Sequence, residues 1–340
     1  MKTRVYLGEN SYDILIENDS LSDCSDLFTK YGRVLVVTDS GVPEEYSKKI
    51  MSCAKDKSVL FVMPEGEENK NIETIMSICK FMLEHNFSRK DCVCAVGGGV
   101  VGDVAAFASS IYMRGVDFYN FPTTLLSMVD SSSGGKTGVD FENVKNILGT
   151  FYQPKRVTID PTVLKTLDKR QIRCGLAEAL KMAATFDEAL FDFMAKSDYD
   201  DNDIGIIIER SVELKKTIVE QDEKEQNIRK SLNFGHTIGH GIEESGKEGL
   251  YHGECVAVGM VAMSSGDAKE KITKALKRIG LPTDASFDQR KVLKTIAHDK
   301  KATANGRISA VTVETIGKYN LTEMSIEELS ERLSSVKRSR

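Results

Sequence analysis

The sequence predicts an α/β N-terminal domain with a Rossmann-like parallel sheet, followed by an all-α C-terminal domain. In the first half, short β-branched or aromatic runs alternate with amphipathic segments, which is the order of elements in a parallel sheet covered by helices. Five of the six prolines lie at or before Pro161, and the later residues form long stretches compatible with helices. A chain of 340 residues is long enough for about two domains.

Four runs are expected to be the strands of the sheet, at residues 33–39, 58–64, 92–98 and 117–122, with an amphipathic helix at 72–83. In such sheets ligands bind beyond the carboxyl ends of the strands. The segments that follow the four strands are therefore expected to converge on one crevice. These segments are Asp39, Glu65–Lys70, Gly97–Asp103 and Thr123–Thr124.

We expect the α/β domain to span residues 1–165 and the helical domain residues 166–340, with the boundary near residues 164–170. Residues 176–196 and 204–226 have the composition of helices. A short strand pair around Ile308–Val313 is the one β feature expected in this half.

Composition excludes several classes of function. A net charge of −5 argues against a protein that coats nucleic acid, which needs a dense basic surface. The seven cysteines have no spacing typical of a disulfide framework or zinc ribbon, and Cys92 and Cys94 are expected to be small buried hydrophobes. No apolar run is long enough for a membrane span, and no secretion signal is recognisable, so a reducing cytoplasm is the expected location.

Three of the five histidines, His236, His240 and His252, fall within residues 233–254. Imidazole is a good zinc ligand, so this window predicts a catalytic metal site. On a helix His236 and His240 would share a face, as in the HExxH motif, but no Glu follows His236 and a metalloprotease is not expected. The alternative is that these histidines cap or fill a core. Gly235, Gly239 and Gly241 would let the backbone approach something closely.

Residues 97–103, GGGVVGD, match G-x-G-x-x-G between a strand and a helix, where backbone N–H groups could hold a pyrophosphate. The motif follows the third or fourth strand and not the first, so a standard Rossmann site is not expected. Earlier in the chain, the segment PEGEENK at residues 64–70 supplies carboxylates and an amine. Asp39, at the end of the first expected strand, could bind ribose hydroxyls. A tight structural turn and a solvated charged loop are the alternatives.

Residues 123–138, with Lys145 and Asn146, are rich in hydroxyls, glycines and lysines that could hold phosphate and sugar hydroxyls. Gly135-Lys136-Thr137 resembles the end of a Walker A loop, but Asp130 occupies the position of its first glycine, so a P-loop is not predicted. A solvated loop is the alternative.

Glu178 and Lys181 lie three residues apart in a predicted helix, which by itself favours a surface ion pair. An anionic ligand is nevertheless needed to complete the histidine site. Lys215, Arg229 and Asn233 precede His236 and could bind a carboxylate or phosphate. Lys300 and Lys301 are expected to form a basic turn near the end of the chain.

Taken in order, these motifs resemble the 3-dehydroquinate synthase family over most of the chain. The resemblance is carried by PEGEENK, GGGVVGD, YMRG, PTTLLSMVDSSSGGKTG, VKN, GLAEALK, RKSLNFGHTIGHGIE, YHGE and HDKK. It implies an α/β dinucleotide-binding domain followed by a helical domain that holds a metal ion, Zn²⁺ or Co²⁺. The implied ligands are Glu178, His236 and His252, with His240 beside the metal or in proton transfer. Spacing alone would instead favour His236 and His240 as the ligand pair.

The resemblance also implies NAD as cofactor and a sugar phosphate as substrate. The residues expected to contact NAD are Asp39, Glu65, Gly66, Glu67, Lys70, Gly98, Gly99, Val100, Gly102, Asp103, Thr123, Thr124, Lys136, Lys145, Leu164 and Thr166. Those expected to contact substrate or take part in catalysis are Arg114, Asp130, Lys136, Lys145, Asn146, Lys181, Lys215, Arg229, Asn233, His240 and one of Lys300 and Lys301.

The implied reaction, in the shikimate pathway, converts 3-deoxy-D-arabino-heptulosonate 7-phosphate into 3-dehydroquinate and phosphate. It combines transient oxidation by NAD, β-elimination of phosphate, re-reduction, ring opening and aldol closure in a homodimeric carbon–oxygen lyase. The alternatives are another sugar-phosphate cyclase, making an inosose, a valiolone or an amino-dehydroquinate, and a metal- and NAD-dependent polyol or glycerol-phosphate dehydrogenase. Met182-Ala183 and Asp140 depart from the family pattern.

Overall fold

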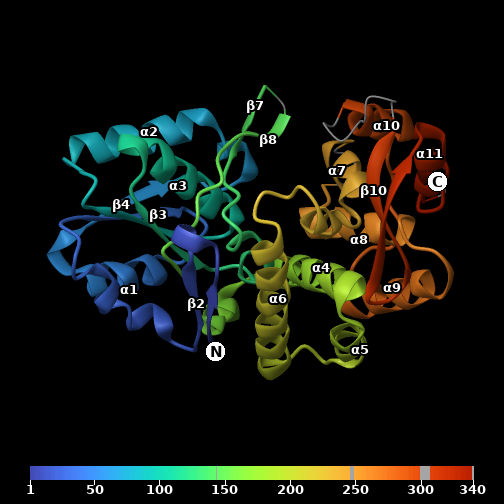
Figure 1. The fold of residues 1–340 in the computed structure, drawn as a ribbon, viewed down its shortest axis with the longest axis horizontal. Helices are drawn as coiled ribbons and strands as arrows, with labels where there is room; N and C mark the ends of the chain where they lie inside the picture. The colour runs from blue at the N-terminus through green and yellow to red at the C-terminus, as the bar shows by residue number, and fades with distance from the viewer. Residues whose placement is uncertain (143, 246–248, 299–306, 339–340) are drawn as a thin grey trace. The chain divides into compact units, whose positions relative to one another are not determined.

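The computed structural model describes residues 1–142, 144–245, 249–298 and 307–338, which form two compact units (Figure 1). Unit 1 comprises residues 1–168 and 215–223, and unit 2 comprises residues 169–214 and 224–340. The sequence predicts one domain boundary, between residues 165 and 166. A continuous helical pattern gives no sign that residues 215–223 return to unit 1, because it does not reveal what each turn packs against.

The centre of unit 1 is a seven-stranded sheet with the strand order β1-β2-β9-β6-β5-β3-β4. Its strands are β1 (Lys2–Val5), β2 (Tyr12–Ile16), β3 (Val34–Asp39), β4 (Ser58–Met63), β5 (Cys92–Gly97), β6 (Asp117–Pro122) and β9 (Arg156–Ile159). β1 pairs with β2 antiparallel, and the remaining neighbours pair in parallel. The predicted parallel sheet is therefore confirmed. β1, β2 and β9 are only four or five residues long, too short for a clear sequence pattern.

Strands β3 and β5 form the buried middle of this sheet. Val34–Val37 and Cys92–Val96 have no exposed surface. Unbroken apolar runs of this kind are typical of parallel strands that helices cover on both faces. The helices of unit 1 are α1 (Glu44–Ala54), α2 (Ile72–Glu84) and α3 (Gly99–Ile111). Cys92 and Cys94 are buried free thiols, as predicted.

The strand order reverses at β3. From β3 the chain passes to β4 at the edge of the sheet and then crosses to β5 on the other side of β3. In open α/β sheets ligands bind outside the carboxyl ends of the strands at such a reversal. Asp39 ends β3 and Gly97 ends β5, so the topology places two of the predicted nucleotide-binding segments there.

In the described part of unit 2, helices are joined by one antiparallel hairpin of β10 (Ile308–Thr315) and β11 (Lys318–Met324), which includes the strand pair expected around Ile308–Val313. Its helices are α4 (Lys169–Phe186), α5 (Glu188–Lys196), α6 (Asp201–Gln221), α7 (His236–Ser245), α8 (His252–Ala262), α9 (Gly266–Ile279), α10 (Gln289–His298) and α11 (Ile326–Ser334). The last turns of α6, from Lys215 onward, belong to unit 1.

Helix α8 is buried on every side, from Gly253 through Cys255–Ala262, as expected for a helix that is apolar all round. Glycines let its neighbours pack directly on its backbone. A Cβ at Gly259 would come within 1.9 Å of the Gly235 carbonyl oxygen, and a Cβ at Gly253 within 2.5 Å of Cys174 Cα in α4. The close approach expected at Gly235 and Gly239 is therefore an approach to α8.

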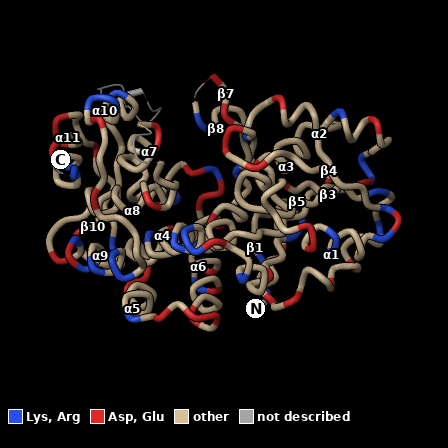
Figure 2. Tube along the Cα trace, turned by 180° about the vertical axis from the view of Figure 1, so that it is seen from behind, with Lys and Arg blue, Asp and Glu red and all other residues tan. Residues whose placement is uncertain are grey.

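Charged residues of both signs are interspersed along the trace (Figure 2). Among the described residues, no helix has both the length and the apolar character needed to cross a bilayer.

Candidate functional site

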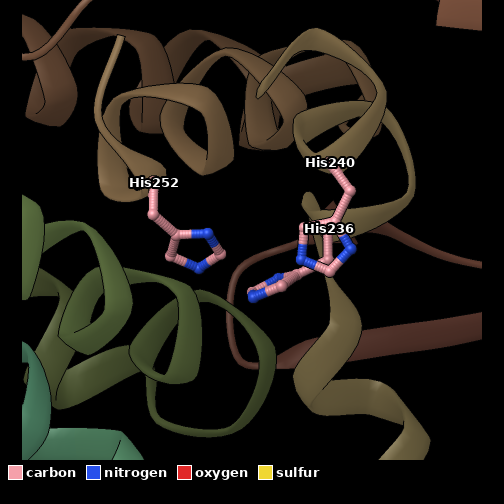
Figure 3. A group of neighbouring side chains, drawn as sticks. All are labelled: His236, His240 and His252. Atoms are coloured by element: carbon pink, nitrogen blue, oxygen red, sulfur yellow. The ribbon is translucent and has the colours of Figure 1, made fainter. Parts of the chain in front are cut away.

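Three helices of unit 2 bring four predicted residues together. Glu178 lies in α4, His236 and His240 on α7, and His252 at the first residue of α8. The three imidazoles gather at one place (Figure 3), with one ring nitrogen of each within 4.8 Å of the others. Glu178 Oε1 lies 3.7 Å from His236 Nε2 and 3.4 Å from His252 Nε2.

These separations suit a zinc-sized ion. Two ligand atoms that each lie about 2.1 Å from zinc in tetrahedral geometry are roughly 3.4 Å apart. The Glu178 side chain is 1% exposed, and apart from the Lys181 ammonium 2.6 Å from Oε2, its carboxylate oxygens have no hydrogen-bond partner among the described residues. Burying a carboxylate is costly unless cations or donors compensate it, so this donor set fits a divalent metal ion.

The hydrogen bonds of two histidines direct Nε2 toward Glu178. His236 Nδ1 lies 3.2 Å from the Phe234 carbonyl oxygen, and His252 Nδ1 lies 3.2 Å from Glu243 Oε2. A ring that donates from Nδ1 keeps the Nε2 lone pair for a metal. Burial would lower the pKa of His252, but Glu178 and Glu243 outweigh it and raise this pKa to about 10. A metal ion must therefore displace a proton from His252.

His240 lies against both rings, with centroids 5.1 Å from His236 and 5.6 Å from His252. The geometry accommodates either the three histidines or Glu178 with His236 and His252 as ligands. We retain the second set as the prediction because it includes the buried carboxylate.

An ion pair links the helices that carry Glu178 and His252. Arg170, near the start of α4, donates from Nε and Nη2 to the two oxygens of Glu254, at 2.7 and 2.6 Å. Its guanidinium also lies 3.9 Å from the Tyr251 ring centre and donates to the Gly249 carbonyl at 2.9 Å. Burial would raise the pKa of Glu254, but Arg170 and the Tyr251 N–H lower it below its ordinary value. Arg170 thus holds the residues immediately before His252.

Other predicted substrate residues of unit 2 lie in or near the same helices. Lys181 and Arg229 are each 1% exposed, and Asn233 donates to Glu225 Oε1 at 2.7 Å. Arg229 and Asn233 belong to the turn η9 (Ile228–Asn233), which precedes α7 closely. Lys300 and Lys301 lie outside the described residues.

Predicted nucleotide residues of unit 1 follow β3, β4, β5 and β6. Asp39 Oδ1 accepts from the backbone N–H groups of Gly41 and Val42, at 2.8 and 3.1 Å. Gly98 caps α3 without a side chain, and a Cβ there would come within 3.1 Å of Thr124. The bare backbone at this helix start can approach a phosphate closely. Val100 and Gly102 lie in α3. Thr123, directly after β6, donates its backbone N–H to the Gly97 carbonyl oxygen at 2.9 Å.

A buried ion pair lies beside this turn. The Lys70 ammonium is 2.7 Å from Asp103 Oδ2 and 4.0 Å from Glu67 Oε1. Burial would lower the pKa of Lys70, but these carboxylates raise it overall. Burial raises the pKa of Asp103 more than Lys70 lowers it. Glu65 and Gly66 are exposed, whereas Leu164 is buried and Thr166 contacts the Tyr46 hydroxyl of α1 at 2.7 Å.

The predicted substrate-binding residues of unit 1 are spread over several of its elements. Lys215 is buried against the carboxylate of Asp130, and Lys145 and Asn146 lie on β8 (Val144–Leu148), which pairs with β7 (Val139–Phe141). Lys136 is exposed. Arg114 is also exposed and lies past the end of α3, a helix length of roughly 18 Å from Gly99. Within unit 1 it is therefore not brought to the glycine turn.

The structure also identifies residues that the sequence reading missed. Asp140 Oδ1 accepts from the Asn146 backbone N–H at 2.8 Å, and so helps to hold β8, which carries Lys145. Glu225, Glu243 and the Arg170–Glu254 pair were not expected either. Glu243 follows His236 by seven residues, which is about two helical turns, and this spacing could have indicated it.

Comparison with known proteins gives concordant matches over most of the chain. The family models described as 3-dehydroquinate synthase N-terminal and C-terminal match residues 60–174 and 175–302. The chain is 39% identical to the 3-dehydroquinate synthase of Streptococcus sanguinis, over 98% of this chain and 99% of that protein. It is 36% identical to that of Acetivibrio thermocellus, over 98% of both.

Solved structures show the same fold. A 2-deoxy-scyllo-inosose synthase complexed with carbaglucose-6-phosphate, NAD⁺ and Co²⁺ is 22% identical, with a TM-score of 0.89 over 99% of this chain and 100% of that one. The 2-epi-5-epi-valiolone synthase of Streptomyces hygroscopicus, with NAD⁺ and Zn²⁺ bound, is 25% identical, with a TM-score of 0.86 over 97% of this chain and 98% of that one. A probable glycerol dehydrogenase from Sinorhizobium meliloti is 15% identical, with a TM-score of 0.62 over 95% of both chains.

Proposed function

Because the chain belongs to the 3-dehydroquinate synthase family, we propose that it binds NAD through residues of unit 1 and a divalent metal ion through residues of unit 2. The protein is an enzyme that converts 3-deoxy-D-arabino-heptulosonate 7-phosphate into 3-dehydroquinate and phosphate, in the shikimate pathway toward chorismate and the aromatic amino acids. The observation that carries the metal proposal is the buried Glu178 carboxylate facing Nε2 of His236 and His252.

We assign the metal to Glu178, His236 and His252, with zinc or cobalt as the ion. When bound, NAD can take up and return a hydride, and the metal ion can acidify a substrate hydroxyl as a Lewis acid. Lys181, beside Glu178 in the same helix, is suited to donate to a substrate hydroxyl or carboxylate. Arg229 offers the planar donors that bind a carboxylate in two places. Such contacts restrict the substrate to productive geometry.

In unit 1 we propose that Lys136, Lys145 and Asn146 bind the substrate phosphate. We propose that the Asp130–Lys215 pair forms hydrogen bonds with a neighbouring part of the substrate. The Asp130 carboxylate pairs with the buried Lys215 ammonium, so this lysine is held in a defined position. The oxygens of the departing phosphate can themselves accept a proton, which explains why few dedicated protein bases are needed.

Four finer assignments belong to this proposal. The reaction class is a phosphate-eliminating carbon–oxygen lyase, the chemistry proceeds through transient oxidation by NAD, the enzyme is a homodimer, and its location is cytoplasmic. The sugar-phosphate substrate agrees with the sugar-phosphate analogue in the inosose synthase complex.

The alternative cyclases and dehydrogenases share the fold at 15 to 25% identity. The 3-dehydroquinate synthases share 36 to 41% identity over nearly the whole chain. The assignment therefore rests on the latter.

An assay of phosphate release against NADH accumulation tests the function. Purified protein is incubated with the heptulosonate phosphate, catalytic NAD and Zn²⁺. We expect phosphate to form in proportion to substrate consumed, with no net NADH, and a chelator to stop the reaction. NADH that accumulates with product would instead indicate a dehydrogenase.

Glucose 6-phosphate serves as the matched control substrate. Phosphate release from it, without release from the heptulosonate phosphate, would assign the protein to an inosose-type cyclase and contradict the proposal.

A further inference from the structure

Helix α7 presents a second group to the candidate metal site. Glu243 lies seven residues after His236, so the two side chains leave the helix on nearly the same face. Its Oε2 is 3.2 Å from His252 Nδ1, and its side chain is 17% exposed. The next residue, Glu244, is exposed. Glu243 therefore contacts the ring of His252 from α7, although His252 itself belongs to α8.

The two nitrogens of His252 face different carboxylates. Nδ1 faces Glu243 at 3.2 Å, and Nε2 faces Glu178 at 3.4 Å. A carboxylate accepts hydrogen bonds, so Nδ1 carries the proton that it shares with Glu243. Once a metal ion displaces the other proton, the neutral imidazole keeps its one N–H at Nδ1, which leaves the Nε2 lone pair on the side of Glu178 and His236.

Of the proposed ligands, His252 is the least restrained by packing. Its side chain is 33% exposed, against 11% for His236 and 1% for Glu178. A ring with this much freedom needs a specific contact to hold its orientation. The hydrogen bond to Glu243 supplies that contact, and the negative charge makes the opposite nitrogen a stronger donor to a metal.

We propose that Glu243 is a positioning residue for the metal site, which holds His252 through Nδ1 so that Nε2 is available to the ion. This role rests on the proposed metal site of Glu178, His236 and His252. Glu243 acts through the imidazole and is not a ligand itself, because it lies on the side of the ring opposite Glu178.

The test is the affinity for Zn²⁺, measured by competition with a chromogenic chelator on the full chain. We expect Glu243→Ala to weaken Zn²⁺ binding by about 10- to 100-fold, the range found for partners of metal-bound histidines. Glu243→Gln keeps a carbonyl acceptor but loses the charge, so its affinity should fall between those of Glu243→Ala and the wild type. Glu244→Ala, the adjacent exposed carboxylate, should bind Zn²⁺ like the wild type.

The thermal midpoint of each metal-free variant shows whether it is folded. If Glu243→Ala is folded and keeps the wild-type affinity, or if Glu244→Ala loses as much, the positioning role is overturned while the metal site stands. If the wild type binds no Zn²⁺ tightly, or Glu178→Gln binds it equally well, the metal site is overturned, and the role of Glu243 with it.

Discussion

At the scale of the residue, the candidate metal site must balance the negative charge of a buried carboxylate. Glu178 is almost fully enclosed, and its Oε1 faces two imidazole nitrogens. Without a metal ion, the balancing positive charge comes from Lys181 and from a protonated His252, whose pKa is raised to about 10. A divalent ion can replace the positive charge of the protonated His252. Metal binding at this site therefore releases a proton.

Residue identities in this site could be predicted, but their mutual geometry could not. The histidine cluster was visible from composition, whereas spacing alone favoured His236 and His240 as a ligand pair. A carboxylate far away in the sequence, such as Glu178, is brought close only by the packing of α4 against α8. Glu243 and Glu254 were missed because isolated glutamates on a helix usually indicate a solvated face.

Glu254 gives a prediction about pH. Its pKa is lowered in the folded protein, so the unfolded state binds more protons below about pH 4.5. The stability it contributes is therefore complete above that pH and is lost as the pH falls through the lowered pKa. We expect Glu254→Gln to reduce the unfolding free energy of the metal-free protein by about 1–2 kcal/mol at pH 7, a modest value because Arg170 is partly exposed.

Urea unfolding of the wild type and Glu254→Gln at pH 7 and at several values below 4.5 measures this difference. The difference should shrink steadily in acid. A difference that stays constant with pH would show that the carboxylate charge of Glu254 is not its source.

At the scale of the element, the crossing of α7 and α8 sets the position of His236. Gly235, directly before this histidine, contacts Gly259 of α8 so closely that no side chain fits at Gly259. The helices therefore contact each other through their backbones. This close packing fixes the position of the first residue of α7.

Replacing Gly259 with alanine should move the start of α7. The added methyl would overlap the Gly235 carbonyl oxygen, so we expect a loss of about 1–3 kcal/mol in unfolding free energy together with weaker Zn²⁺ binding. Gly205→Ala in α6 is the matched control, since a Cβ there meets nothing within 4 Å. It should be neutral or stabilise by about 0.5–1 kcal/mol. Chemical denaturation and chelator competition give both quantities, and equal behaviour of the two variants would contradict the crossing argument.

Elements with strong patterns could be predicted from the sequence. β3, β4, β5 and β6 coincide with the four expected strands because their apolar runs are flanked by Asp, Pro or Gly. β1, β2 and β9 could not, since their pairing partners lie far along the chain. The glycines at the start of α7 predicted a close contact, but only the fold shows that the contact is with α8.

At the scale of the whole molecule, the residues proposed for NAD and those proposed for the metal belong to different units. The two binding functions should therefore be separable by mutation. We expect Glu178→Gln to lose Zn²⁺ while keeping NAD affinity. Lys70→Met should weaken NAD binding by about 10- to 100-fold, the worth of a hydrogen bond to a charged group, while keeping Zn²⁺.

Isothermal titration with NAD and chelator competition for Zn²⁺ measure both affinities in each variant. Glu188→Gln and Lys80→Met replace exposed residues of the same types and should change neither affinity. Loss of both ligands in either test variant would contradict the assignment of separate sites.

The return of residues 215–223 to unit 1 has a consequence for recombination between related genes. A chimera joined after residue 168 would take its first sheet from one parent and the segment carrying Lys215 from the other, so Asp130 would meet a foreign partner. Gln153, which donates to Glu223 at 3.0 Å, would face the same mismatch. Exchanging this unit intact requires three breakpoints in the gene, at residues 168, 214 and 223.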